Sequence, residues 1–229
     1  MRFKAADRAE EFYAICCLES HRHGSWIVGE NLGTVPPYVN PALARHNIKG
    51  MYVMQYELAP RRKLPGVPSN CVASLNTHDT PLFAGFWQGL DIEDLRELGL
   101  VSPESANQRH EIREAQKKAL VSSLRAGACL KNSTMSARAV FQASLDFLSS
   151  SSAHFVQVNL EDLWLEAAPQ NVPGTGHERP NWRRKAVYTF EQFSKMPGVL
   201  KALGKVNKYR HRNGSIRIKK RELISNEQS

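Results

Sequence analysis

The stretch CVASLNTHDT, at residues 71–80, joins a short apolar run directly to a run of amide, hydroxyl, imidazole and carboxyl side chains. The apolar half has the length and composition of a buried β-strand. The polar half follows the carboxyl end of that strand, where parallel α/β folds place ligands and catalytic groups. The stretch therefore predicts an α/β fold with a site around His78 and Asp79.

The same pattern recurs along the chain. Three more strand-like segments lie at residues 25–29, 51–56 and 155–160. Helical spacing and capping signals mark residues 7–22, about 102–127 and 137–148. Such an alternation of helices with short apolar strands is typical of parallel strands joined by crossover helices. It predicts about half of a barrel-like sheet, with Glu30, which ends the first segment, at the same mouth as His78 and Asp79.

The composition excludes several classes of protein. The chain has 229 residues, 41% hydrophobic and 23% charged, unlike collagens, coiled coils or disordered chains. No stretch approaches the roughly 20 apolar residues of a membrane span, so no membrane partner is expected. Residues 1–17 carry charges throughout and no apolar core, which argues against a secretory signal. The four cysteines include no CxxC pair and indicate neither a disulfide framework nor a zinc ribbon. With no export signal, a reducing cytoplasm is the expected location.

Positive charge is concentrated at the C-terminus. The formal net charge is +9, and residues 201–229 hold nine Lys or Arg against two Glu. The rest of the chain is nearly neutral, whereas nucleic-acid-binding proteins usually spread positive charge over a folded face. We therefore expect residues 205–229 to form a solvated basic tail, and we expect no nucleic-acid partner. Binding of nucleic acid through this tail is the lowest-ranked of three functional hypotheses.

A series of motifs carries a family resemblance. In chain order they are LESHR at 18–22, IVGENLGTVP at 27–36, SLNTHDT at 74–80, FAGFW at 83–87, NVPGT at 171–175 and PNWRR at 180–184. Together they resemble glycoside hydrolase family 77, the 4-α-glucanotransferases or amylomaltases. The resemblance runs from about Tyr13 to Lys185, and the motifs occur in the order that the family has.

The resemblance implies a (β/α)₈ barrel, of the TIM type, that acts on α-1,4-glucans. Enzymes of this kind retain the anomeric configuration: one carboxylate attacks the anomeric carbon and a carboxylic acid protonates the departing oxygen. A sugar hydroxyl then takes the glycosyl group in place of water. The implied partner is an α-1,4-glucan or maltooligosaccharide, and neither a cofactor nor a metal ion is expected.

Two carboxylates match family positions with catalytic roles. By the resemblance, Glu30 is the general acid/base. A Glu at a strand end can be held partly desolvated, which raises its pKa and keeps a proton available near neutral pH. Asp79 matches the carboxylate that stabilises the oxocarbenium-like transition state and holds sugar hydroxyls.

Other side chains are expected to contact the sugar. His78 matches a donor to a sugar hydroxyl at the cleavage site, and Asn171 is expected to line the sugar cleft. Trp87 and Trp164 have two possible roles, stacking on sugar rings or packing in the core, and the sequence does not decide between them.

Two departures from the family pattern bear on activity. Asn31 stands where the family usually has Asp, which removes a charge beside the acid/base. The nucleophilic Asp has no match in this chain. The family has it upstream of Glu30, and the one Asp found there, Asp7, begins a predicted helix.

The chain is therefore expected to be the C-terminal half of a TIM-type barrel, about strands five to eight, incomplete on its own. Its expected domains are the barrel portion, residues 1–204, and the basic tail, residues 205–229. A retaining transferase that lacks one of its two carboxylates is expected to be inactive. Two hypotheses lead: a glucanotransferase fragment that needs a missing N-terminal half, and a glucan-binding remnant without turnover. Open strand edges also favour self-association.

Overall fold

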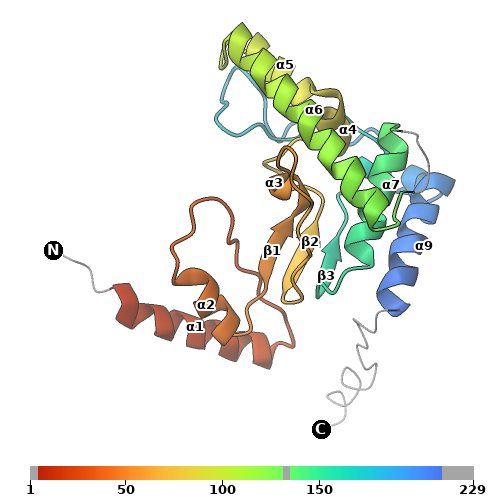
Figure 1. Ribbon diagram of the computed structural model, residues 1–229. Coiled ribbons are helices and arrows are strands. Elements are labelled where there is room, and N and C mark those ends of the chain that lie inside the picture. The colour runs from red at the N-terminus through yellow and green to blue at the C-terminus, as the bar shows by residue number, and fades with distance from the viewer. Residues whose placement is uncertain (1–4, 131–134, 213–229) are drawn as a thin grey trace.

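The computed structural model describes residues 5–130 and 135–212, and a small parallel sheet lies near their centre (Figure 1). Its strands are β1 (Gly50–Val53), β2 (Cys71–Ser74) and β3 (Phe155–Gln157), in that order. Both pairs are parallel, with Gly50 opposite Cys71 and Val72 opposite Phe155. The order and direction confirm the predicted α/β fold.

A fourth segment extends the sheet beside β1. Val28 forms an isolated parallel bridge with Lys49, and Gly29 N donates to Lys49 O at 2.8 Å. Gly50 N donates instead to Asn70 O, at 3.1 Å. Because alternate residues of a parallel strand bond to opposite neighbours, the segment around Val28 lies on the side of β1 away from β2. The order across the sheet is therefore the order along the chain.

The strands are shorter than predicted. Residues 25–29 form one bridge and not a strand, and β3 holds three of its six predicted residues. After Val53 the chain enters α3 (Met54–Glu57), where Gln55 Nε2 donates to the backbone oxygen of Pro81 at 3.0 Å. Apolar periodicity does not distinguish the end of a buried strand from the first turn of a buried helix, so the predicted strands run too long.

The helices predicted from periodicity and capping are confirmed as α1 (Ala5–Arg22), α6 (Pro103–Ala126) and α7 (Ala137–Ser149). At the start of α6, Ser102 Oγ accepts from Ser105 N at 3.2 Å and Pro103 takes the first helical position. The remaining helices are α2 (Val39–Arg45), α4 (Phe83–Gln88), α5 (Leu90–Glu97), the 3₁₀ helix η1 (Glu161–Trp164), α8 (Phe190–Phe193) and α9 (Pro197–Arg212).

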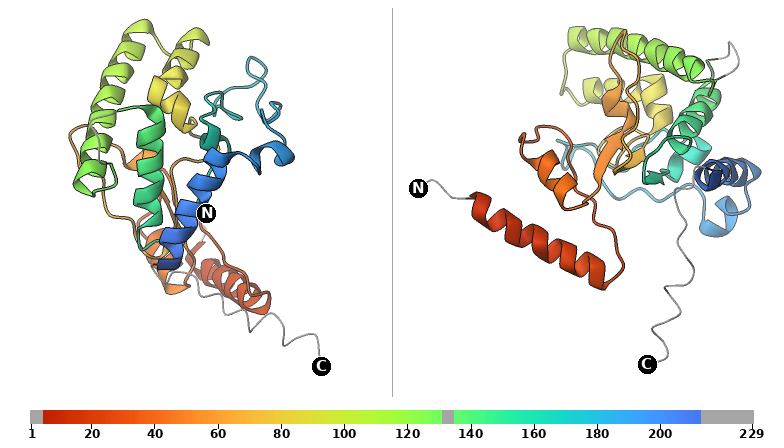
Figure 2. Two further views of the ribbon diagram at one scale, coloured as in Figure 1. Left: turned by 90° about the vertical axis from the view of Figure 1, so that its right-hand side faces the viewer. Right: turned by 60° about the horizontal axis from the view of Figure 1, so that its bottom comes forward.

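One apolar core joins the sheet to α4, α6 and α7. Its most deeply buried side chains, each at most 1% exposed, include Met54, Ala73, Phe83, Leu124 and Phe141. On the outside of this layer α9 packs against α7 (Figure 2). The core thus holds β2 and α4 in fixed positions, and the loop between them carries His78 and Asp79.

The predicted boundary between barrel portion and tail, at residues 204 and 205, falls inside α9. Beyond it, Lys205 pairs with Asp146 of α7, and the buried Arg210 donates to the backbone oxygens of Ser151 and His154, each at 3.1 Å. Residues 205–212 are thus packed on the fold. The rest of the predicted tail, residues 213–229, lies outside the described residues.

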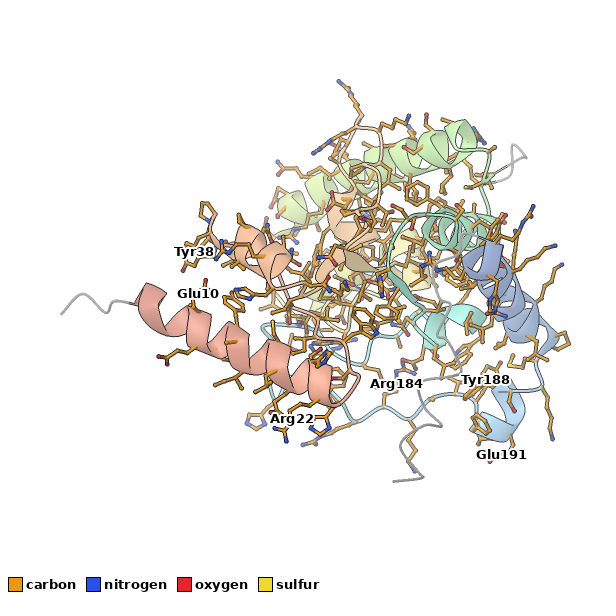
Figure 3. The ribbon with its side chains drawn as sticks, turned by 90° about the horizontal axis from the view of Figure 1, so that it is seen from below. Glu10, Arg22, Tyr38, Arg184, Tyr188 and Glu191 are labelled. Atoms are coloured by element: carbon orange, nitrogen blue, oxygen red, sulfur yellow. The ribbon has the colours of Figure 1, made fainter. Side chains whose placement is uncertain are left out.

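α1 lies at the periphery, against α2 (Figure 2). Glu10 joins the two helices, with its carboxylate 2.9 Å from Arg45 Nη2 and 3.0 Å from His46 Nε2, and it points toward α2 in Figure 3. Three apolar side chains at helical spacing are more than half exposed on α1: Phe12, Ile15 and Leu18. The helix therefore presents an apolar stripe to solvent.

Candidate functional site

A tight turn after β2 carries His78 and Asp79. Thr77 N donates to Thr80 Oγ1 at 2.9 Å, and Asp79 N donates to Thr77 Oγ1 at 3.1 Å. Hydroxyl groups that bond to nearby backbone stabilise such turns. The His78 and Asp79 side chains are 60% and 41% exposed, with Nε2 and Oδ2 3.4 Å apart. Both project toward solvent beyond the carboxyl end of the sheet.

Asn171 reaches this turn from a distant part of the chain. Its Nδ2 donates to Asp79 Oδ1 at 2.7 Å, across a separation of 92 residues. The bond fixes one carboxylate oxygen of Asp79. The structure thus brings together three of the four predicted site residues, Asp79, His78 and Asn171.

The loop that carries Asn171 is held by its neighbours. Asn181 Oδ1 accepts from Val172 N at 3.1 Å, and Asn181 Nδ2 donates to Thr175 Oγ1 at 2.9 Å. Trp182 N donates to Gln170 O at 2.7 Å. These bonds join the two family-like motifs, residues 171–175 and 180–184, into one rigid unit.

A buried carboxyl group supports the loop between β2 and α4. Asp162 is 1% exposed, and its two oxygens accept from Asn76 Nδ2 and from Phe83 N, each at 2.7 Å. Asn76 lies two residues after the end of β2, and Phe83 begins α4. Asp162 therefore anchors both ends of the loop that holds Asp79. Burial raises the pKa of Asp162 to about 6, with a smaller contribution from the nearby carboxylate of Glu161, while the hydrogen bonds oppose the shift.

Asp162 is not among the predicted site residues. The available signal is the pair of carboxylates, Glu161 and Asp162, directly after a predicted strand. Glu161 is paired with Arg184 at 2.5 Å, and Arg184 also lies 3.4 Å from Glu166. Figure 3 shows Arg184 in the segment that leads to α8. The pair holds the 180–184 motif against η1, so Arg184 has a structural role.

Glu30 lies at the end of the segment bridged to β1. Glu30 therefore lies at the same carboxyl edge of the sheet as Asp79, and β1 lies between the two strand segments that they follow. The partly desolvated environment predicted for Glu30 is not found, because the side chain is exposed and has no hydrogen-bonding or ion-pair partner within residues 5–130 and 135–212. The cause is an open edge: among the described residues, no strand pairs with this segment on the side away from β1.

Asn31 fixes the backbone beside Glu30. Its Oδ1 accepts from Met51 N of β1 at 2.7 Å, and its Nδ2 donates to Asn40 Oδ1 of α2 at 2.8 Å. A carboxylate has the acceptor for the first bond and lacks the donor for the second. Both the oxygen and the nitrogen of the Asn31 amide thus form hydrogen bonds, which link the segment around Val28 to β1 and α2.

The tryptophans divide clearly between core and surface. Trp87 is 8% exposed and stacks on Phe83 with ring centroids 5.7 Å apart, and the half-buried Trp164 packs edge-on to Tyr188. Both therefore pack in the interior, which decides between the two roles left open for them. Trp182, in contrast, is 61% exposed and lies beside His78, with ring centroids 5.6 Å apart.

A groove of about 950 Å³ is lined by other residues. It runs between α6 and the loop at 61–63, and its lining mixes cations such as Arg62 and Lys118 with Glu111 and Glu114. None of the predicted site residues lines it. Within the described parts of the chain no group of three His, Cys, Asp or Glu residues is arranged to hold a metal ion. None of the helices described there has the length and apolar content to cross a membrane.

Residues 4–189 match a protein family described as 4-alpha-glucanotransferase. The 4-alpha-glucanotransferase of Haemophilus influenzae is 31% identical in an alignment over 188 residues that covers 77% of this chain and 26% of that protein. The 4-alpha-glucanotransferase of Mycobacterium tuberculosis is 28% identical in an alignment over 176 residues that covers 74% of this chain and 24% of that protein. The chain thus spans about a quarter of the length of these curated relatives.

Solved structures that share the fold include two amylomaltases. Amylomaltase from Corynebacterium glutamicum matches with a TM-score of 0.72 at 23% identity, over 85% of this chain and 30% of that one. Amylomaltase from Streptococcus agalactiae, solved in complex with acarbose, matches with a TM-score of 0.54 at 16% identity, over 82% of this chain and 32% of that one.

Proposed function

Because the chain belongs to the 4-alpha-glucanotransferase family, glycoside hydrolase family 77, we propose that it forms part of a site for retaining transfer of α-1,4-glucan segments between maltooligosaccharides. The observation that carries the proposal is the bond from Asn171 to Asp79, beside His78. It joins motifs 92 residues apart at the carboxyl edge of a parallel sheet, where α/β enzymes place their chemistry.

The proposal includes the finer architecture. The bridged segment around Val28, β1, β2 and β3 follow one another across the sheet in chain order, as successive strands of a (β/α)₈ barrel do. We assign them to about strands five to eight. The amylomaltase structures that share this fold are about three times as long, which supports an assignment to part of a barrel.

Each side chain has a distinct part in the proposed chemistry. Glu30 donates its proton to the departing glycosidic oxygen and later takes one from the acceptor hydroxyl. Asp79 holds sugar hydroxyls and stabilises the positive charge that develops at the anomeric carbon. His78 donates to a sugar hydroxyl, and Asn171 keeps one oxygen of Asp79 in place. A bound glucan covers the exposed Glu30 and supplies the desolvation that the free chain lacks.

The nucleophile is the unmet requirement. Retention needs a second carboxylate on the opposite face of the sugar, and no residue of the chain matches the family's nucleophile motif. The two carboxylates after β3 do not substitute for it, because both oxygens of the buried Asp162 accept hydrogen bonds and Glu161 is paired with Arg184. We therefore propose that the 229-residue chain binds glucan and performs no turnover alone.

Two assays on the purified chain test this. Calorimetry with maltoheptaose should show binding that Asp79→Asn weakens, while Arg96→Gln, on the exposed face of α5, leaves it unchanged. Incubation with maltotriose should release no glucose and form no longer oligosaccharides. A wild-type chain that does not bind maltoheptaose would refute the glucan site. Transfer that Glu30→Gln abolishes would show that a nucleophile is present and would refute the second part.

Four of the eight Lys and Arg residues of the basic tail lie in 213–229, outside the described residues, and no described feature favours nucleic acid. Nucleic-acid binding through the tail stays the lowest-ranked hypothesis, and a salt titration of the full chain tests it, since contacts with phosphate weaken steeply as salt increases.

A further inference from the structure

Trp182 is the most exposed of the four tryptophans. Its side chain is 61% exposed, compared with 53% for Trp26 and 8% for Trp87, and Trp164 is half-buried. An exposed indole is unfavourable in water, because its apolar surface contributes no hydrophobic free energy until another molecule or side chain covers it. Core packing therefore does not explain why tryptophan occupies this position.

The backbone at Trp182 is held in a disfavoured conformation. Its φ is +60°, in the left-handed region that favours glycine. Surrounding bonds enforce it: Trp182 N donates to Gln170 O at 2.7 Å, and Asn181 N donates to Arg179 O at 2.9 Å. Backbone strain of this kind is found preferentially at ligand sites, where the fold has fixed a side chain in a required direction.

The ring lies where the proposed sugar site is. Its centroid is 5.6 Å from that of the His78 imidazole, with the two planes at 49°. His78 lies 3.4 Å from Asp79, and Asp79 accepts from Asn171 in the same loop unit that carries Trp182. Polar groups for sugar hydroxyls and a flat apolar surface thus lie side by side on fixed elements.

We propose that Trp182 is a stacking platform for one glucose unit of an α-1,4-glucan bound beside His78 and Asp79. The apolar C–H face of a pyranose covers the indole, while Asp79, Asn171 and His78 serve the hydroxyls at the ring's edge. The inference rests on the proposed function, because it names how that same site binds its glucan. It adds a binding residue whose contribution is apolar and independent of catalysis.

The left-handed backbone at Trp182 allows a substitution that removes the ring without straining the loop. Trp182→Gly removes the ring and suits the φ of this position, so the loop keeps its shape. Calorimetry with maltoheptaose should then show affinity reduced about tenfold, the size expected for losing one good aromatic stacking contact. Trp182→Phe should recover most of the loss, because a smaller flat ring remains. The unfolding midpoint should not fall in Trp182→Gly.

Trp26 is the matched control. It is 53% exposed, yet it lies at the amino end of the sheet beside His154, with ring centroids 4.6 Å apart. Trp26→Phe should bind maltoheptaose as the wild type does. In that variant, where Trp182 is the one exposed indole left, maltoheptaose should shift the tryptophan emission to the blue.

The outcomes separate the two proposals. If the wild type binds maltoheptaose and Trp182→Gly binds equally well, the platform is refuted and the glucan site stands. An unchanged emission spectrum at saturating maltoheptaose in Trp26→Phe refutes it too. A wild type that does not bind maltoheptaose overturns the proposed function, and the platform with it.

Discussion

Asp162 is a carboxyl group excluded from water by the structure that it supports. Both oxygens accept hydrogen bonds, from Asn76 Nδ2 and Phe83 N, and yet burial raises its pKa from 3.8 to about 6. Of the charged groups nearby, Glu161 adds to the shift and is itself paired with Arg184. The ionised form is therefore less favourable in the folded chain than in the unfolded chain.

This raised pKa fixes the sign of a pH effect. Well below pH 4 the group is protonated in both states, and from about pH 4 to 6 the unfolded chain is the more ionised of the two, so stability falls as pH rises. The shift corresponds to roughly 3 kcal/mol. Because the unfolded carboxyl is already about half ionised at pH 4, the free energy of unfolding in urea should fall between pH 4 and 7 by roughly 2 kcal/mol more in the wild type than in Asp162→Asn. The exposed-site control, Glu114→Gln, should follow the wild-type curve, and parallel curves for all three proteins would contradict the prediction.

Residue identity predicts some site members and not others. His78, Asp79 and Asn171 carry polar groups in motifs, so the sequence indicates them, and the fold then brings them together. Trp182 and Asp162 differ, because their significance depends on exposure and burial. Those properties are set by residues far along the chain: Asn76 and Phe83 for Asp162, and His78 for Trp182.

At the scale of elements, the loop from Glu166 to Trp182 has no regular secondary structure. Its shape comes from side chains, chiefly Asn181, which bonds to Val172 N at 3.1 Å and to Thr175 Oγ1 at 2.9 Å. A buried or half-buried amide that bonds on both sides acts as a local substitute for a strand pair. The loop should therefore open as one unit when this amide is lost.

Asn181→Ala tests that expectation. The substitution leaves Val172 N without its acceptor at a cost of about 1–2 kcal/mol, so amide exchange in residues 171–176 should accelerate by roughly 5- to 30-fold. Hydrogen exchange followed by mass spectrometry measures it. The matched control is Asn40→Ala, a substitution on α2 that removes the side-chain bond between Asn40 and Asn31. It should leave amide exchange in this loop unchanged. Equal exchange in both variants would show that other contacts hold the loop.

At the scale of the whole molecule, the alternation of helix and strand predicts the parallel sheet because each crossover returns the chain to the same edge. The extent of the sheet is less predictable. β1 stops at Val53, where Gln55 bonds to Pro81, and the segment at 25–29 pairs only through Val28. Both limits depend on contacts between distant parts of the chain, which a local apolar pattern does not encode.

The same open surfaces predict how the chain behaves in solution. Phe12, Ile15 and Leu18 form an exposed apolar stripe on α1, and the segment around Val28 leaves a sheet edge unpaired among the described residues. Exposed stripes and open edges both promote association. We expect sedimentation velocity to show concentration-dependent self-association that the double substitution Ile15→Lys and Leu18→Lys reduces. Leu200→Lys, at a similarly exposed leucine on α9, should not, so equal effects of the two changes, or a monomeric wild type, would contradict a role for α1.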